Sequence, residues 1–204
     1  MDKTYSQHVE WHSNNCDITH NLNHDLNENS IVFDIGGYTG KWTSQINDKF
    51  RSKIFIIEPI LEFYRELENK FNHIENIKYK QVGIGVKNET CKINSINGDA
   101  TQIIHSDDGD ITIQLETLET IMTFFDVKNI DFLQINIEGA EYDILENWIE
   151  TKIIEKINTI QIQFHQLSYI PNVVERRDKI RENLQKLGYK EKFNYQWVWE
   201  CWTK

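Results

Sequence analysis

An acid followed by three closely spaced glycines stands near the start of the chain, at Asp34, Gly36, Gly37 and Gly40. Residues of strand-forming character precede the acid, and a helical pattern follows the last glycine. This order predicts a parallel strand that turns sharply into a helix, and open α/β sheets bind ligands at such turns. Glycines there let a ligand approach the backbone, and the Asp34 carboxylate can accept hydrogen bonds from an amine or from loop N–H groups.

A second acid narrows the class of ligand. Glu58 ends the next predicted strand, 53–57, at the distance expected for binding the hydroxyls of a ribose. A dinucleotide site needs Gly-x-Gly-x-x-Gly, whereas here the glycine spacing differs and bulky Tyr38 lies inside the turn. The spacing therefore favours S-adenosylmethionine, which has no phosphate groups, over NAD. An ordinary strand-to-helix turn without a nucleoside site is the alternative.

The segments 131–141 and 159–165 also place polar side chains at predicted strand ends. The first passes through Asn136 and Glu138 into a helix, and the second ends at His165. Because a buried parallel strand is normally apolar on both faces, polar rows on these strands need an explanation. They either line a wet pocket or form a polar layer shielded by helices. The rows are Gln134 and Asn136 on one strand, and Gln161, Gln163 and His165 on the other.

The composition limits the class of protein. At 204 residues the chain is long enough for one α/β domain and too short for two. A net charge of −10 argues against a nucleic-acid partner and against an anionic membrane surface. No run of about 18 apolar residues is present to span a bilayer, and we expect no secretory signal in the polar N-terminal region. Three scattered cysteines, Cys16, Cys91 and Cys201, favour the reducing cytoplasm over a disulfide framework.

The pattern divides the chain into an N-terminal cap, 1–29, and a single α/β domain, 30–204. A third parallel strand is predicted over 77–86. The segment 89–117 then interrupts the alternation of strands and helices with two strands and the polar loop 97–101. We expect an antiparallel insertion there, near the ligand face.

Four histidines and a cysteine recur every four residues in the N-terminal cap. On one continuous helix they would form a stripe of ligands suited to zinc. The intervening Ser13–Asn15 has poor helix propensity and is predicted to break that helix. A solvated, histidine-rich cap is the simpler interpretation, and we assign no metal ligands. The series comprises His8, His12, Cys16, His20 and His24.

Three segments together, 33–40, 57–59 and 135–141, resemble the FkbM family of S-adenosylmethionine-dependent methyltransferases. Their order and spacing match over about 30–165. The resemblance implies a class I, Rossmann-like α/β fold: a mostly parallel sheet with an antiparallel C-terminal strand and helices on both faces. It also implies O-methylation, commonly of sugar or polyketide hydroxyls.

The resemblance also implies a set of cofactor-binding residues. The chain departs from the family pattern in the glycine loop, which lacks the usual Ala-Asn pair, and at Asn136, where the family has an acid. That replacement removes a carboxylate that could act as a base or metal ligand. The implied residues are Asp34, Gly36 and Gly40 at the amino-acid end of the cofactor, Glu58 at the ribose, Val82 and Gly83 at the adenine, and Gly37 and Pro59 as further cofactor-binding residues.

Methyl transfer to a hydroxyl requires an aligned acceptor, exclusion of water and a group that takes the proton. His165 and Glu138 are the candidate proton acceptors, and the ordinary pKa of histidine suits the role. Asn136 could orient the acceptor, and Glu141 could support Asn136 or the helix N-terminus. We therefore assign His165, Glu138 and Asn136 as catalytic, acting on a hydroxyl of a small molecule or sugar.

Other functions fit the same sequence. A degenerate methyltransferase fold could serve as a binding or scaffold protein, which the replacement at Asn136 favours. An NAD-linked oxidoreductase or epimerase would share the fold class. Acids at several strand ends also permit a magnesium-assisted methyltransferase, so a divalent metal stays open beside S-adenosylmethionine. The sequence does not determine the oligomeric state.

Overall fold

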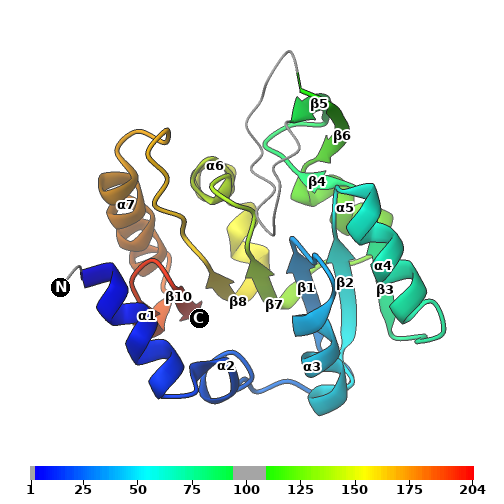
Figure 1. The fold of residues 1–204 in the computed structure, drawn as a ribbon, viewed down its shortest axis with the longest axis horizontal. Coiled ribbons are helices and arrows are strands. Elements are labelled where there is room, and N and C mark those ends of the chain that lie inside the picture. Colours follow the sequence, from blue (N-terminus) through cyan, green and yellow to red (C-terminus); the bar gives the residue numbers. More distant parts are fainter. Residues whose placement is uncertain (1–2, 94–108) are drawn as a thin grey trace.

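The structure, a computed structural model, describes residues 3–93 and 109–204. Within these residues seven strands form the main sheet: β1 (Ile31–Ile35), β2 (Lys53–Ile57), β3 (Ile77–Lys80), β7 (Ile130–Ile135), β8 (Ile157–Ile162), β9 (Lys190–Tyr195) and β10 (Trp199–Thr203). Their order is β3-β2-β1-β7-β8-β10-β9 (Figure 1). The first five in that order are parallel, and β10 is antiparallel to both neighbours. The predicted mostly parallel sheet with an antiparallel C-terminal strand is confirmed.

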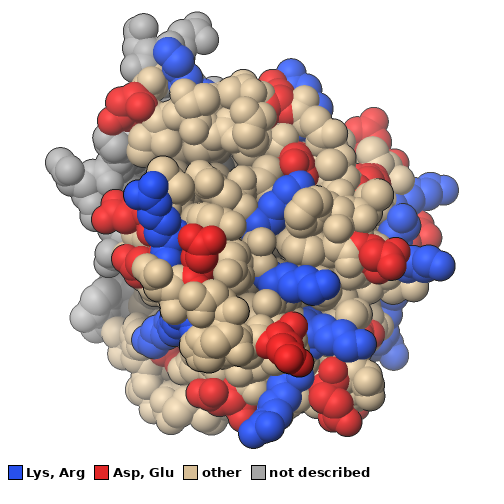
Figure 2. Space-filling view, turned by 90° about the vertical axis from the view of Figure 1, so that its right-hand side faces the viewer, with Lys and Arg blue, Asp and Glu red and all other residues tan. Residues whose placement is uncertain are grey.

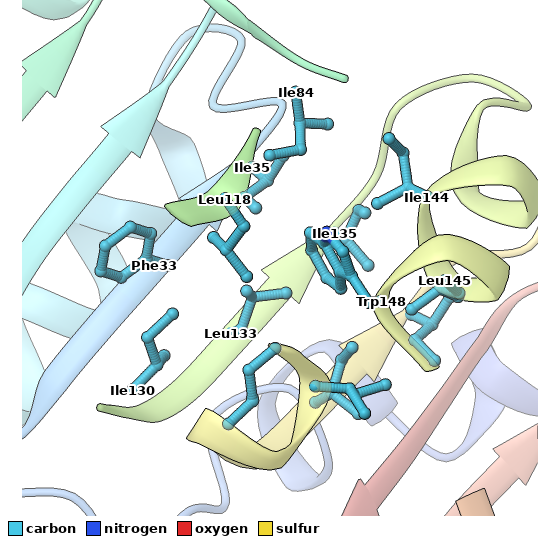
Figure 3. Packing of buried hydrophobic residues seen from close by; sticks show 14 of the residues in the cluster. Phe33, Ile35, Ile84, Leu118, Ile130, Leu133, Ile135, Ile144, Leu145 and Trp148 are labelled. Atoms are coloured by element: carbon cyan, nitrogen blue, oxygen red, sulfur yellow. The ribbon is translucent and has the colours of Figure 1, made fainter. Parts of the chain in front are cut away.

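Helices cover both faces of this sheet, as the family resemblance implies. One face carries α3 (Lys41–Phe50) and α4 (Leu61–Phe71); the other carries α5 (Leu118–Phe124), α6 (Glu141–Glu150), η1 (Ile153–Lys156) and α7 (Val173–Lys186). The central strands are mostly apolar on both faces because both faces are buried, and Asp34, Gln134 and Gln161 are the buried polar exceptions. Figure 3 shows part of the larger core cluster, which joins β1, β7 and α6 and includes Phe33, Ile135 and Trp148.

A second, smaller sheet stands above β2 and β3 (Figure 1). In the described part of the chain it consists of β4 (Gly83–Ile84), β5 (Glu89–Ile93) and β6 (Ile111–Glu116), in the order β4-β6-β5. β5 and β6 are antiparallel, and β4 is parallel to β6. The polar loop predicted at 97–101 lies outside the described residues.

The prediction of one continuous strand over 77–86 is wrong. The N–H of Val82 donates to the carbonyl of Lys80 at 3.1 Å, so the chain bends immediately after β3. Beyond the bend, Gly83 and Ile84 pair with β6 instead of continuing beside β2. Apolar residues recur at every second position on both sides of the bend, but the consecutive polar residues Lys80 and Gln81 shift them from odd to even positions. This shift of phase marks the bend in the sequence.

The N-terminal segment, residues 3–29, first packs at the β9–β10 end of the main sheet and then runs past β8 and β7 to the start of β1 (Figure 1). It begins with α1 (Lys3–Ser13) and α2 (Cys16–Thr19). Asn15 between them has a left-handed φ of 52°, which confirms the predicted break in the helix. Trp11, Cys16 and Val198 form a buried cluster there with aromatic side chains of β9 and β10.

The members of the histidine series have different surroundings in the structure. Cys16 is fully buried, His20 meets the ring of Phe193 edge-on at 5.0 Å, and His24 lies 4.1 Å from the ring of Phe132. Among the described residues, no group of three or more His, Cys, Asp or Glu side chains is placed to hold a metal ion. No helix in the described ranges is long and apolar enough to cross a membrane.

Candidate functional site

The glycine loop, residues 36–40, joins β1 to α3 and lies between the ends of β2 and β7. The N–H groups of Gly36 and Gly37 donate to the carbonyl of Ile57 at 2.9 and 3.2 Å. Gly36 has φ +85°, and a Cβ at this position would overlap the backbone oxygen of Asn136. Glycine is therefore required at Gly36 by the close approach of β7, which brings the predicted cofactor loop and Asn136 together. Gly40 is the N-cap residue of α3 and packs on Phe71.

Asp34 lies at the end of β1 and is almost completely buried. Its Oδ2 accepts a hydrogen bond from the Thr43 hydroxyl at 2.6 Å. Burial raises the pKa of Asp34 to about 6, although hydrogen bonds from Thr43 and Gln134 act in the opposite direction. Pairing with a cation stabilises the ionised form of a buried carboxylate whose pKa is raised.

Glu58 joins the glycine loop to α4. Its two oxygens accept the backbone N–H groups of Tyr38 at 3.0 Å and Ile60 at 2.8 Å. Burial raises the pKa of Glu58 to about 7, against the lowering effect of these hydrogen bonds. A carboxylate has further lone pairs for hydroxyl donors, so Glu58 can hold the loop and still bind a ribose.

The residues predicted at the adenine lie beside Glu58. A Cβ at Gly83 would stand 3.5 Å from Cβ of Pro59, so the two segments are in contact. Val82 is buried in the main core cluster, and its side chain therefore serves packing. Only the backbone at Val82 and Gly83 is left to flank a ligand.

A cavity of about 240 Å³ opens beside the glycine loop. Its lining includes Asp34, Gly36, Gly37 and Asn136, together with Trp42 of α3. Within the described structure, Oδ1 of Asn136 and Nε1 of Trp42 are buried without a hydrogen-bond partner. Buried polar atoms normally have partners, so one acceptor and one donor here are available to a ligand. Because ligand pockets usually exceed about 300 Å³, the cavity would hold one part of a nucleoside cofactor.

The two polar strand rows meet across β7 and β8. Gln134 pairs in register with Gln161, whose Nε2 donates to Gln134 at 2.8 Å and to Asn21 at 3.0 Å. Gln134 lines the cavity, whereas Gln161 is fully buried under Asn21 of the N-terminal segment. Both interpretations of the rows are thus partly correct: one end faces the cavity, and the other is a shielded polar layer.

His165 lies between two carboxylates. Its Nδ1 is 2.9 Å from Oε1 of Glu141, and its Nε2 is 3.3 Å from Oε2 of Glu138. Burial alone would lower the pKa of His165, but hydrogen bonds and charges from Glu138 and Glu141 raise it to about 10. The ring is therefore an imidazolium near neutral pH, with both nitrogens donating.

The turn between β7 and α6 holds this cluster in place. Glu141 is completely buried, and its oxygens accept the N–H groups of Ile137 and Gly139 at 2.8 and 2.9 Å. Glu138 has a left-handed φ of 54°, an unusual backbone conformation for a residue other than glycine. The structure brings Glu138 and His165 together, as predicted, but an imidazolium has no lone pair with which to take a proton.

Several residues at the site escaped the sequence analysis. Thr43 is a fully buried polar residue on α3, and Asp17, Asn21 and Trp199 line the same cavity from outside the predicted ligand loops. The spacing of Thr43 after the glycine loop was a usable signal, since it lies on the first turn of α3 facing β1. The other three come from distant chain segments, and no local pattern marks them.

Comparison with known proteins gives one family. A family model described as the methyltransferase FkbM domain matches residues 34–191. No curated protein matches this chain. The solved structure of a methyltransferase FkbM from Methylobacillus flagellatus KT is similar over 90% of this chain, with 14% identity and a TM-score of 0.58. This chain spans only 45% of that one.

Two further solved structures share the fold. A Methanococcus jannaschii fibrillarin, a pre-rRNA processing protein, is 16% identical over 88% of this chain and 68% of its own, with a TM-score of 0.53. A Streptococcus mutans protein in complex with SAH is 11% identical over 88% of this chain and 90% of its own, with a TM-score of 0.50. These likenesses show a class I methyltransferase fold, and the match over 34–191 shows that the chain belongs to the FkbM methyltransferase family.

Proposed function

We propose that this chain is an S-adenosylmethionine-dependent O-methyltransferase that acts on a hydroxyl of a small molecule or sugar. The observation that carries the proposal is the buried Asp34 carboxylate beside the cavity at the glycine loop. A buried acid with a raised pKa favours a ligand that brings a positive charge. Glu58, which follows the neighbouring strand β2, would accept hydrogen bonds from the ribose hydroxyls.

The residues present fit that cofactor. Asp34 would pair with its ammonium group, Glu58 would accept from its ribose, and the backbone at Pro59 and Gly83 would flank its adenine. The unpaired Oδ1 of Asn136 offers one more acceptor at the end of β7. The Streptococcus mutans structure in complex with SAH has the same fold, which supports a cofactor of this kind.

When bound, S-adenosylmethionine supplies a methyl group on a positively charged sulfur, which is already a strong electrophile. The chain must then orient the acceptor, exclude water and remove the hydroxyl proton. We assign the proton to Glu138, whose side chain is 24% exposed and is held against His165. His165, as an imidazolium, positions this carboxylate, and Asn136 orients the acceptor through its amide.

The acceptor is proposed to be small and not a nucleic acid. Figure 2 shows the side of the molecule that carries α4 and β3, where basic and acidic side chains are interspersed. Together with a net charge of −10, this gives no basic stripe there to follow a phosphate backbone. The free thiols of Cys16, Cys91 and Cys201 accord with a reducing compartment such as the cytoplasm.

Calorimetric titration of the purified chain tests the proposal. We expect binding of S-adenosylmethionine and S-adenosylhomocysteine, and much weaker binding of NAD. Equal or tighter binding of NAD would favour an oxidoreductase. Binding of no nucleoside ligand would point to a scaffold with a degenerate site. Repeating the titration with EDTA and with added Mg²⁺ shows whether a divalent ion takes part.

A further inference from the structure

The N-terminal segment reaches the cavity at the glycine loop. Asp17 and Asn21 line the cavity, as does Trp199 of β10. All three lie outside the 34–191 range that matches the family. This chain therefore builds one side of its candidate cofactor site from residues that the family match does not cover.

Asp17 is held at that position by packing. Its Oδ1 accepts the indole N–H of Trp11 at 2.8 Å. Trp11 is buried and meets the ring of Tyr195 edge-on, with ring centroids 5.1 Å apart. The neighbouring Cys16 is fully buried in the same cluster. An exposed carboxylate at the cavity edge is thus fixed by a rigid aromatic cluster.

A second attachment ties the segment to the buried acid of the site. Asn21 accepts from Gln161, Gln161 donates to Gln134, and Gln134 hydrogen-bonds Asp34. This row crosses three neighbouring strands at the ends where the cavity lies. The N-terminal segment is therefore linked to Asp34 through the side chains of Gln161 and Gln134.

The charged side chains that line the cavity carry a net negative charge. Its charged lining residues are Asp17, Asp34 and Lys41, which give two negative charges and one positive charge when all are ionised. S-adenosylmethionine carries an ammonium, a carboxylate and a sulfonium, and so has one net positive charge. S-adenosylhomocysteine lacks the sulfonium charge and is neutral overall. The net negative cavity complements the first compound better than the second.

We propose that Asp17 is a ligand-binding residue of this site, through which the N-terminal segment favours the sulfonium form of the cofactor over its demethylated product. The inference rests on the proposed function. An exposed ion pair contributes little free energy, so the expected preference is modest. Its consequence is that the product leaves more readily than the cofactor after the methyl group is transferred.

Asp17→Asn tests the inference, because asparagine keeps an acceptor for Trp11 and removes only the charge. Glu10→Gln is the matched control: it removes one charge from the same segment, and Glu10 does not line the cavity. Calorimetry at low salt should show binding of S-adenosylmethionine weakened about 1.5- to 5-fold by Asp17→Asn, and binding of S-adenosylhomocysteine nearly unchanged. Added salt should shrink the difference.

The outcomes separate the inference from the proposed function. Equal losses for both compounds, no loss for either, or the same change in Glu10→Gln would overturn the role of Asp17 while the function stands. If the unaltered chain binds neither compound, the proposed function itself fails. Unfolding midpoints of the two variants, measured in urea, show whether each folds as the parent does.

Discussion

Nδ1 of His165 lies 2.9 Å from Oε1 of Glu141, and that carboxylate is completely buried. The same carboxylate accepts the N–H groups of Ile137 and Gly139, so it shapes the turn from β7 into α6. His165 thereby ties the chain after β8 to that turn. Glu138, the proposed base, lies against the other ring nitrogen of His165. The contact between His165 and Glu141 therefore also fixes the ring beside the proposed base.

Replacing His165 should cost stability in a pH-dependent way. His165→Gln removes the cation beside buried Glu141, and we expect a loss of about 1.5–3 kcal/mol in the free energy of unfolding near neutral pH. The pKa of His165 is raised to about 10 in the folded chain, from 6.5. The stabilisation is therefore complete below pH 6.5 and is lost as the pH rises through about 10.

Urea unfolding of both proteins at about pH 6, 8 and 10 checks this expectation. The difference between parent and variant should shrink toward the highest pH. His73→Gln, an exposed histidine outside the cluster, is the control and should change little. A difference that stays constant over the whole range would show that His165 is not held as a cation.

Glu138→Gln should lower the rate of methyl transfer without weakening the binding of the cofactor. Loss of a general base typically costs about 10²- to 10⁴-fold in rate. Glutamine keeps the size of the side chain and an oxygen that can accept from His165, so the turn should remain. The measurement is methyl transfer to an identified acceptor, with cofactor binding by calorimetry, and Glu150→Gln at the exposed end of α6 is the control. Full turnover in Glu138→Gln would assign the proton to another group.

Binding of S-adenosylmethionine should strengthen as the pH rises toward neutrality. Burial raises the pKa of Asp34 to about 6, so the free site is mostly protonated below that pH. Pairing with the ligand's ammonium group favours the ionised form, and affinity should therefore rise up to about tenfold per pH unit below 6 and level off above it. Asp34→Asn should remove this part of the dependence, whereas Asp48→Asn, an exposed acid on α3, should retain it. An unchanged pH profile in Asp34→Asn would exclude Asp34 from the contact.

Gly36→Ala should destabilise the fold far more than an equivalent change elsewhere. The added Cβ would overlap the carbonyl oxygen of Asn136, and φ is +85°. We expect a loss of about 2–5 kcal/mol from the combined clash and backbone strain. Gly188→Ala is a close control, because Gly188 has φ +90° and nothing stands within 4 Å of its Cβ position. That variant should lose only about 1–2 kcal/mol. Similar losses in urea unfolding would show that the end of β7 yields to the new side chain.

The sequence by itself determined the parts of this protein that depend on local chemistry. Strand-forming residues before Asp34 and glycines after it specify a strand and a sharp turn, since both depend on backbone preferences of a few neighbouring residues. The alternation of such strands with helices indicated a parallel sheet, and poor helix propensity at Asn14 and Asn15 indicated the break between α1 and α2.

The tertiary structure decided what depends on contacts between distant residues. The bend after Lys80 moves the next strand into another sheet, where it pairs with β6, a strand that is distant in the sequence. The charge of His165 follows from the neighbouring carboxylates of Glu138 and Glu141, which outweigh the opposite effect of burial. The position of a histidine in the sequence carries no information on these contacts. Asp17 reaches the cavity because Trp11 packs on the C-terminal hairpin, and such long-range packing depends on shape and burial that no spacing of residues records.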